Sequence, residues 1–237
     1  MDLRLFLNSG QVFNWRERAG EFFVAHSGHI IRLAQSNRGL QYSVFPPRQD
    51  SVKFVSDFLG LGRDYAAELS NFSGDAAMMA SMRACPGLSI SRQDPFECLL
   101  AFLISQNNNI ARIRSTLLRL SDEFGENVFV DGIEFPVFPT PASLAGASLR
   151  RLRYCGLGYR AEYVKSAAKA VTDGFDLEGL LKTDYASAKN QLMSLDGVGP
   201  KVADCVLVFG LGFGEAFPVD LWIARIMRRH YAKRRMS

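Results

Sequence analysis

The alternation of apolar and polar positions changes character near residue 46. Before that point the chain holds short stretches that alternate, or that are rich in aromatic and β-branched residues, and turn residues such as Ser27-Gly28 separate them. Such stretches between turn signals are typical of β-strands. We therefore predict an antiparallel sheet, closed by Pro46-Pro47. Its predicted strands cover residues 11–16, 21–25, 29–33 and 40–44.

From residue 52 onward the apolar positions follow a helical period. The clearest helix start is Asp94-Pro95-Phe96-Glu97, in which Asp is a favoured N-cap, Pro fits the first helical position and Glu follows at the third. The helix that follows is apolar through Ile104 and is predicted to be buried on all sides. Residues 125–141, interrupted by Gly and Pro, are predicted to form a loop. Further helices are predicted over residues 52–59, 65–69, 74–83, 110–124, 143–155, 161–172, 185–195, 200–209 and 219–231.

This pattern predicts an α+β protein with an N-terminal antiparallel β-sheet and a larger helical region. We place the sheet and its accessory helices in residues 1–90 and the helical region in residues 91–237. Within the latter, the glycines near residue 197 predict a helix-hairpin-helix motif over about residues 186–210.

Composition narrows the class of protein. The 237 residues are 48% hydrophobic and 22% charged, which is ordinary for a globular protein. The apolar runs are shorter than the roughly 20 residues that span a bilayer, and no signal peptide is recognised at the N-terminus. Four widely spaced cysteines and three unclustered histidines predict neither a catalytic metal nor a cofactor. We expect a monomer without membrane contact, in the cytoplasm or nucleoid of a prokaryote or in the nucleus of a eukaryote.

The charge distribution is compatible with a polyanionic partner but does not demonstrate one. The net charge is only +4, and two basic clusters cover residues 150–153 and 225–235. For either cluster alone, a solvated helix face is the favoured interpretation.

The stretch from Leu195 to Cys205, followed by Pro218-Val219-Asp220, carries the strongest chemical signal. Gly197-Val198-Gly199 is either a plain turn between helices or a hairpin that presents backbone N–H groups to a phosphate. Lys201 follows this stretch after Pro200, in the first turn of a predicted helix. The partial positive charge of a helix N-terminus disfavours a cation. An enzyme that uses a neutral amine as nucleophile gains from this placement.

These motifs resemble those of the helix-hairpin-helix, Gly-Pro-Asp class of DNA base-excision glycosylases, and within it the 8-oxoguanine DNA glycosylases. Four further stretches are similar and lie in the same order along nearly the whole chain. They are residues 9–15 (SGQVFNW), 93–98 (QDPFEC), 105–112 (SQNNNIAR) and 156–161 (GLGYRA). The resemblance implies a TBP-like N-terminal sheet and damaged double-stranded DNA as partner. It also implies excision of 8-oxoguanine with a Schiff-base lyase step.

The resemblance assigns roles at the reacting base. It implies that Lys201 is the nucleophile and that Asp220, whose plain role is a helix N-cap, is also catalytic. Cys205 lies one helical turn after Lys201 and is either a small buried side chain or a wall of the base pocket. Gly10 either makes only a turn or offers its carbonyl to the N7–H that distinguishes 8-oxoguanine from guanine.

The resemblance also assigns residues that contact the DNA around the lesion. Asn107, in a loop between two helices, matches the residue that fills the space of a flipped base. Arg112 and Arg160 match arginines that read the orphaned cytosine, and Tyr159 matches a wedge beside it. Taken singly, these would more often be loop residues and surface charges. The hairpin glycines implied in DNA binding are Gly197 and Gly199.

Two departures from the family pattern raise alternatives. Trp222 stands where the animal enzymes have histidine, and Ser237 ends the sequence before their pocket-closing helix. We therefore expect a truncated chain, another closing segment or relaxed selectivity. The alternative functions are an alkylbase glycosylase of the same superfamily and a non-catalytic helix-hairpin-helix module that binds DNA.

Overall fold

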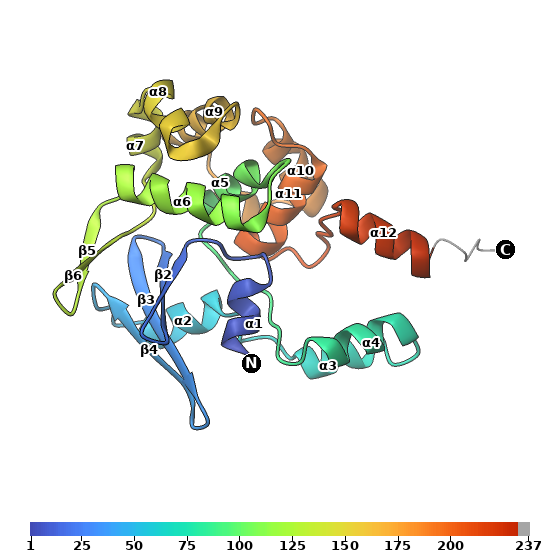
Figure 1. Cartoon of the computed structure of the whole chain (residues 1–237). Helices are drawn as coiled ribbons and strands as arrows, with labels where there is room; N and C mark the ends of the chain where they lie inside the picture. The colour runs from blue at the N-terminus through green and yellow to red at the C-terminus, as the bar shows by residue number, and fades with distance from the viewer. Residues whose placement is uncertain (232–237) are drawn as a thin grey trace.

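The computed structural model describes residues 1–231, and it confirms the predicted α+β class. The N-terminal sheet is a four-stranded antiparallel meander in the order β1-β2-β3-β4 (Figure 1). Val24, Ile31 and Val44 pair across β2, β3 and β4, and all three are buried. Side chains on this face therefore form the core of the sheet half. The strands are β1 (Trp15–Arg18), β2 (Glu21–His26), β3 (His29–Ser36) and β4 (Gly39–Phe45).

A short helix, α1 (Leu3–Asn8), precedes the sheet and was not predicted. The Asp2 carboxylate caps it by accepting a hydrogen bond from the Leu5 N–H at 2.8 Å. The strand predicted over residues 11–16 is wrong at its start, because β1 begins only at Trp15. The side chains of Gln11 and Asn14 are buried in hydrogen bonds with residues far along the chain. Their polar groups therefore have partners that a regular strand pattern does not foresee.

The loop predicted over residues 125–141 is also wrong, since it contains the hairpin β5 (Asn127–Val130) and β6 (Ile133–Pro136). Asp131 and Gly132 both have positive φ, 49° and 79°, as a tight two-residue hairpin turn requires. Phe135 stacks on Phe23 of β2, with ring centroids 4.6 Å apart. The hairpin thus extends the core outward from the sheet.

The helical region surrounds α5 (Pro95–Ser105), whose residues from Cys98 to Ile104 are all buried, as predicted. The Asp94 carboxylate caps α5 through the N–H groups of Phe96 and Glu97. The single helix predicted over residues 143–155 is divided at Ala147-Ser148. The remaining helices are α2 (Ser51–Phe58), α3 (Tyr65–Ser70), α4 (Ala76–Ala84), α6 (Ile110–Phe124), α7 (Pro141–Gly146), α8 (Leu149–Leu152), α9 (Arg160–Thr172), α10 (Tyr185–Met193), α11 (Pro200–Cys205) and α12 (Leu221–His230). The shorter turns are the π-helical Arg153–Leu157 and Val206–Leu211 and the 3-10 turn Glu178–Lys182.

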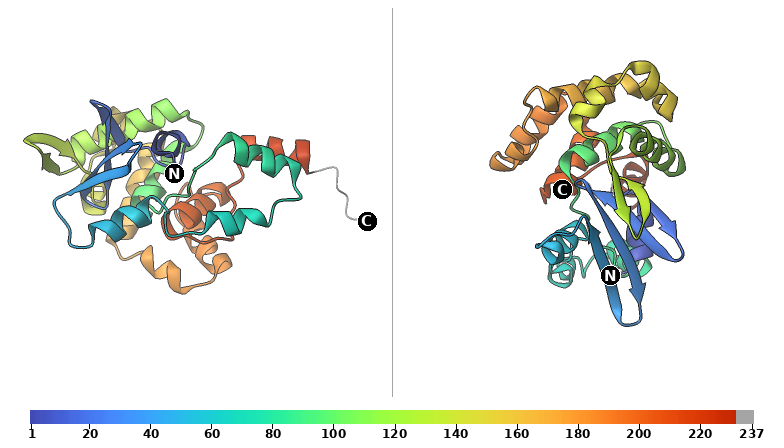
Figure 2. Two further views of the ribbon diagram at one scale, coloured as in Figure 1. Left: turned by 90° about the horizontal axis from the view of Figure 1, so that it is seen from below. Right: turned by 90° about the vertical axis from the view of Figure 1, so that its left-hand side faces the viewer.

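Each half of the chain forms one large hydrophobic core. One contains buried residues from Leu3 to Leu59 and the other, apart from Phe13, buried residues from Phe96 to Ala216. The division into residues 1–90 and 91–237 stays a prediction. Helices α3, α4 and α12 project from the same end of the molecule (Figures 1 and 2). Within residues 1–231, no helix combines the length and apolar character needed to cross a bilayer.

Candidate active site

The predicted helix-hairpin-helix consists of α10, the turn around Gly197 and α11. Gly197 has a φ of +79°, and a Cβ atom built there would lie 2.5 Å from Cγ of Tyr163. Glycine is therefore required at this position. Gly199 differs, since its φ is −90° and an added Cβ would meet no atom within 4 Å. The space beside Gly199 is open, and a ligand can approach the backbone closely there.

A buried ionic network fixes α11 against α10. Asp204, only 5% exposed, accepts hydrogen bonds from the Tyr185 hydroxyl at 2.7 Å and from Nζ of Lys189 at 2.9 Å. The hydrogen bond to this carboxylate raises the pKa of Lys189. The network determines how α11, and hence Lys201, faces the rest of the site. The sequence analysis did not identify it.

The amine of Lys201 is directed toward α5. Its Nζ lies 3.3 Å from Oγ of Ser105 and 4.8 Å from the ring centroid of Phe102. The side chain is half-buried. The amine is therefore held at the end of α5 while part of the side chain remains accessible.

Cys205 lies one turn after Lys201 and is 2% exposed. Burial raises the pKa of its thiol to about 12, and the nearby Lys201 opposes this effect only in part. At neutral pH the thiol is thus uncharged. Cys205 can form a small apolar wall, in agreement with both interpretations of this residue.

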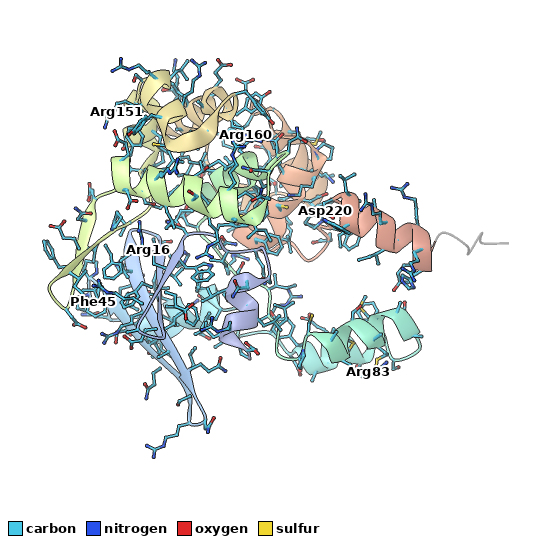
Figure 3. The ribbon with its side chains drawn as sticks, viewed as in Figure 1. Arg16, Phe45, Arg83, Arg151, Arg160 and Asp220 are labelled. Carbon is cyan, nitrogen blue, oxygen red and sulfur yellow. The ribbon has the colours of Figure 1, made fainter. Side chains whose placement is uncertain are left out.

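Asp220 caps α12, because its carboxylate accepts a hydrogen bond from the Ile223 N–H at 2.8 Å. The same carboxylate lies close enough to Cys205 to contribute to the high pKa of the thiol. Figure 3 shows Asp220 at the end of α12 nearest the helical core. The structure therefore brings Lys201, Cys205 and Asp220 together from two helices.

Gly10 lies in the turn after α1, with a φ of +85°. An added Cβ would lie 3.6 Å from Cδ1 of Ile110, at the start of α6. The positive φ, rather than a lack of space, favours glycine at this position.

Two buried glutamines hold the Gly10 turn in place. The Gln11 amide donates to the Ser89 carbonyl and accepts from the Ser91 N–H, both at 2.8 Å. The Gln93 amide donates to the Gln11 carbonyl at 2.8 Å, and the Gln93 N–H donates to the Phe209 carbonyl at 2.7 Å. Phe209 follows Lys201 and Cys205 along the same helical stretch. The two glutamines thus link the Gly10 turn to the helix that carries the amine.

Asn107 and Tyr159 meet at the tip of the loop between α5 and α6. Asn107 has a φ of +47°, and its amide lies 3.5 Å from the Tyr159 hydroxyl. Tyr159 is 51% exposed. Both side chains are therefore available to a ligand on this side of the molecule.

The two predicted cytosine-reading arginines differ in position. Arg160 is only 5% exposed and donates to the backbone carbonyls of Gln106 and Asn107 (Figure 3). It holds the Asn107 loop in this structure. Arg112 is exposed in the first turn of α6, where Asn109 caps its N–H at 2.9 Å. Recognition of cytosine stays a prediction for both.

Surface ion pairs engage two arginines of the basic cluster at residues 150–153. Arg151 pairs with Glu123 and Arg153 with Glu162, both at 2.8 Å. Arg228 and Arg229 lie in the last turn of α12. The rest of the predicted basic segment, residues 232–235, lies outside the described residues. Over residues 1–231, no three His, Cys, Asp or Glu side chains are grouped so as to hold a metal ion.

Two family models together match residues 1–236. Residues 100–236 match the model of the HhH-GPD superfamily of base excision DNA repair proteins. The chain belongs to this superfamily. Residues 1–99 match the model of the 8-oxoguanine DNA glycosylase N-terminal domain. The two matches together extend over both halves of the fold.

Individual superfamily members agree with this assignment. The N-glycosylase/DNA lyase of Saccharomyces cerevisiae is 38% identical over 259 residues, covering 95% of this chain and 67% of the relative. The 8-oxoguanine glycosylase/lyase of Clostridium acetobutylicum, solved with duplex DNA containing cytosine opposite 8-oxoguanine, has a TM-score of 0.90 and 28% identity. That likeness covers 100% of this chain and 82% of the other.

A further solved structure, MBOgg1 in complex with a low-affinity DNA ligand, gives a TM-score of 0.91 at 31% identity. It covers 99% of this chain and 81% of the other. The chain spans 53 to 67% of the length of the curated N-glycosylase/DNA lyases that it matches.

The sequence analysis quoted some site residues without assigning them a role. Gln11, Gln93 and Ser105 all belong to motifs that resemble the family, so the signal was present. Their tasks are hydrogen bonds to residues far away in the sequence. Only the folded chain reveals those partners.

Proposed function

We propose that this protein excises 8-oxoguanine from duplex DNA and then cleaves the abasic strand through a Schiff base. The observation that carries the proposal is that the Lys201 amine and the Asp220 carboxylate both lie close enough to the Cys205 thiol to act on its pKa. The N-terminal half supports the lesion assignment, because it matches the 8-oxoguanine glycosylase model.

In the proposed reaction, the lone pair of the neutral Lys201 amine forms a bond to C1′ of the damaged nucleoside. The electron pair of the glycosidic bond leaves with the base, which takes up a proton. Nζ then gives up a proton, the C1′–O4′ bond breaks as O4′ takes up a proton, and a protonated imine forms between Nζ and C1′. Loss of a C2′ proton expels the 3′ phosphate and breaks the strand.

Asp220 contributes to the step in which the base departs. Positive charge develops on the sugar as the glycosidic bond breaks, and a fixed carboxylate stabilises it without reorganisation. The cap to Ile223 holds the carboxylate in place.

We propose that base recognition uses Gly10 and Cys205. The Gly10 carbonyl accepts a hydrogen bond from N7–H of 8-oxoguanine, which guanine lacks. The uncharged thiol of Cys205 forms one wall of the pocket. The glutamines that anchor the Gly10 turn hold this carbonyl at a fixed position relative to the helix that carries the Lys201 amine.

The proposed partner is damaged double-stranded DNA, bound by a monomer. Asn107 would occupy the space left by the flipped nucleotide, and Tyr159 would act as a wedge beside the orphaned cytosine. Arg112 would face this cytosine, and Arg160 would reach it on leaving the Gln106 and Asn107 carbonyls. Gly197 and Gly199 would present the hairpin backbone to phosphates. A repair role places the protein with DNA, in the nucleoid or the nucleus.

Replacing Lys201 by Gln tests the nucleophile. Duplexes with 8-oxoguanine opposite each of the four bases are incubated with enzyme, with and without borohydride. The wild-type protein should give cleaved strand and a trapped covalent adduct, whereas K201Q should give no adduct and bind the duplex with similar affinity. Lys169→Gln, at an exposed position on α9, is the matched control and should trap normally.

Trapping that survives in K201Q would contradict the assignment. Release of 3-methyladenine without dependence on Lys201 would instead identify an alkylbase glycosylase. Salt-sensitive binding with no product from any lesion would identify a non-catalytic module.

A further inference from the structure

Ser105 is the last residue of α5, and its hydroxyl makes two contacts. Its Oγ donates a hydrogen bond to the Phe102 carbonyl at 2.8 Å. The same oxygen lies 3.3 Å from Nζ of Lys201. A hydroxyl has one proton to donate and two lone pairs that accept. Because the proton is directed at Phe102, the side of the oxygen that faces Lys201 can only accept.

A hydrogen-bond acceptor beside a nucleophilic amine leaves the lone pair of the amine free. A neutral amine carries two N–H bonds and a single lone pair. If a neighbouring hydroxyl donated to it, the lone pair would be occupied and attack would be suppressed. When the hydroxyl accepts instead, one N–H is fixed toward α5 and the lone pair stays free.

The surroundings leave the amine few other arrangements. The Phe102 ring lies 4.8 Å from Nζ on the α5 side, and Cys205 interacts with Lys201 from the next helical turn. Gln106, directly after Ser105, donates to the carbonyls of Leu103 and Gly197, both at 3.1 Å. The end of α5 is therefore bound to the hairpin that precedes Lys201, so Ser105 and Lys201 keep their spacing.

We propose that Ser105 is a positioning residue for the nucleophile. Its hydroxyl, committed to Phe102 as donor, holds one N–H of Lys201 and directs the amine lone pair toward the flipped nucleotide. This inference rests on the proposed function, because it assigns a partner to the same amine.

The test measures the single-turnover rate of borohydride trapping on a duplex that carries a preformed abasic site. Ser105→Ala removes the acceptor and should slow trapping about tenfold, since one hydrogen bond of ordinary strength is lost. Ser105→Thr keeps a hydroxyl that can bond the same carbonyl and should trap within about threefold of the wild type. Thermal midpoint and duplex affinity should stay unchanged in both variants.

Ser70→Ala is the matched control. Ser70 ends α3, and its Oγ donates to the carbonyl three residues earlier, that of Ala67, at 2.7 Å. It therefore reproduces the local hydrogen bond of Ser105 away from Lys201. S70A should trap at the wild-type rate.

The dependence of the trapping rate on duplex concentration separates positioning from a structural role. In S105A the rate at saturating duplex should fall while the duplex concentration at half-maximal rate stays unchanged, because the amine is misdirected after the DNA has bound. A general loosening of the fold would also lower the thermal midpoint and raise that half-maximal concentration.

The inference is overturned if S105A traps like the wild type, if S105T is as slow as S105A, or if the loss in S105A is confined to weaker duplex binding. A wild-type protein that forms no adduct at all contradicts the proposed function instead.

Discussion

Asp220 combines a structural and a chemical role in one carboxylate. As the N-cap of α12 it accepts the Ile223 N–H at 2.8 Å. As a charge near Cys205, it faces the reacting sugar in the proposed mechanism. The two roles depend on different properties, because a cap needs only an acceptor oxygen whereas charge stabilisation needs the ionised carboxylate.

Asp220→Asn should therefore separate them. Asn caps helices about as well as Asp, so the thermal midpoint should stay close to that of the wild type. Excision of 8-oxoguanine under single-turnover conditions should fall roughly 100-fold, the usual scale for losing one electrostatic contact to a transition state. Asp184→Asn, at the N-cap of α10 where Ser187 N–H is accepted at 3.0 Å, should change neither quantity. A loss of stability in D220N proportional to the loss of activity would mean that capping alone explains the residue.

The hairpin between α10 and α11 shows how two glycines in one turn can have different causes. Gly197 is required by the fold, because its φ is positive and Tyr163 occupies the space of a side chain. Gly199 has ordinary backbone angles and an open side. The fold therefore explains the first glycine, whereas the proposed phosphate contact would account for the second.

Alanine at each position should give distinct results. Gly197→Ala should lower the free energy of unfolding by at least about 2 kcal/mol, from left-handed strain and overlap with Tyr163. Gly199→Ala should cost less than about 1 kcal/mol yet weaken binding to duplex DNA, because a methyl group enters the space proposed for phosphate. Chemical denaturation and a duplex-binding titration check both expectations. Wild-type DNA affinity in G199A would contradict the proposed contact.

Helices and strands that depend on interactions between residues close in the sequence are the easiest to predict. The helix starts at Asp94 and Asp220 depend on caps within three residues, and both agree with the structure. The hairpin β5–β6 was missed, although Asp131-Gly132 is a local turn signal, because its short strands adjoin Gly and Pro residues. The division of the helix at residues 147–148 was missed as well, although Ser148 caps α8 by accepting a hydrogen bond from the Arg151 N–H.

At the scale of the whole molecule, the sheet half buries a histidine in an apolar site. His26, at the end of β2, lies between Phe54 and Phe58 of α2, with ring centroids 4.9 and 4.8 Å away. Its Nδ1 has no hydrogen-bond partner among residues 1–231. Burial, together with the charges of His29 and Arg48, lowers the pKa of His26 to about 3. The imidazole is thus neutral in the folded protein at neutral pH.

This burial predicts acid sensitivity of the whole fold. Between the ordinary pKa of about 6.5 and the folded value of about 3, the unfolded chain binds more protons, so stability falls as the pH falls. The contribution is about 1.4 kcal/mol per pH unit, or about 2 kcal/mol between pH 6.5 and pH 5. Denaturant unfolding of His26→Leu should show a flatter pH dependence over this range. His230→Gln, on exposed α12, should retain the wild-type slope, and an equal slope in H26L would refute the prediction.

The sequence by itself determined the fold class, most helix limits and the order of the family motifs. The fold class and the helix limits depend on periodicity, caps and glycine turns, which act over a few residues. The resemblance to the 8-oxoguanine DNA glycosylases implied Lys201, Asp220, Gly10 and Cys205 as residues of one site.

Only the tertiary structure decided which groups meet across long separations. No local pattern predicts the hydrogen bond from the Lys201 amine to the Ser105 hydroxyl, 96 residues away. The same holds for the hydrogen bond from the Gln93 side chain to the Gln11 carbonyl, 82 residues away. The tertiary structure also placed Arg160 against the Asn107 loop rather than at the surface. A hydrogen bond needs its partners within about 3 Å, and packing of distant elements, rather than residue type, sets such distances.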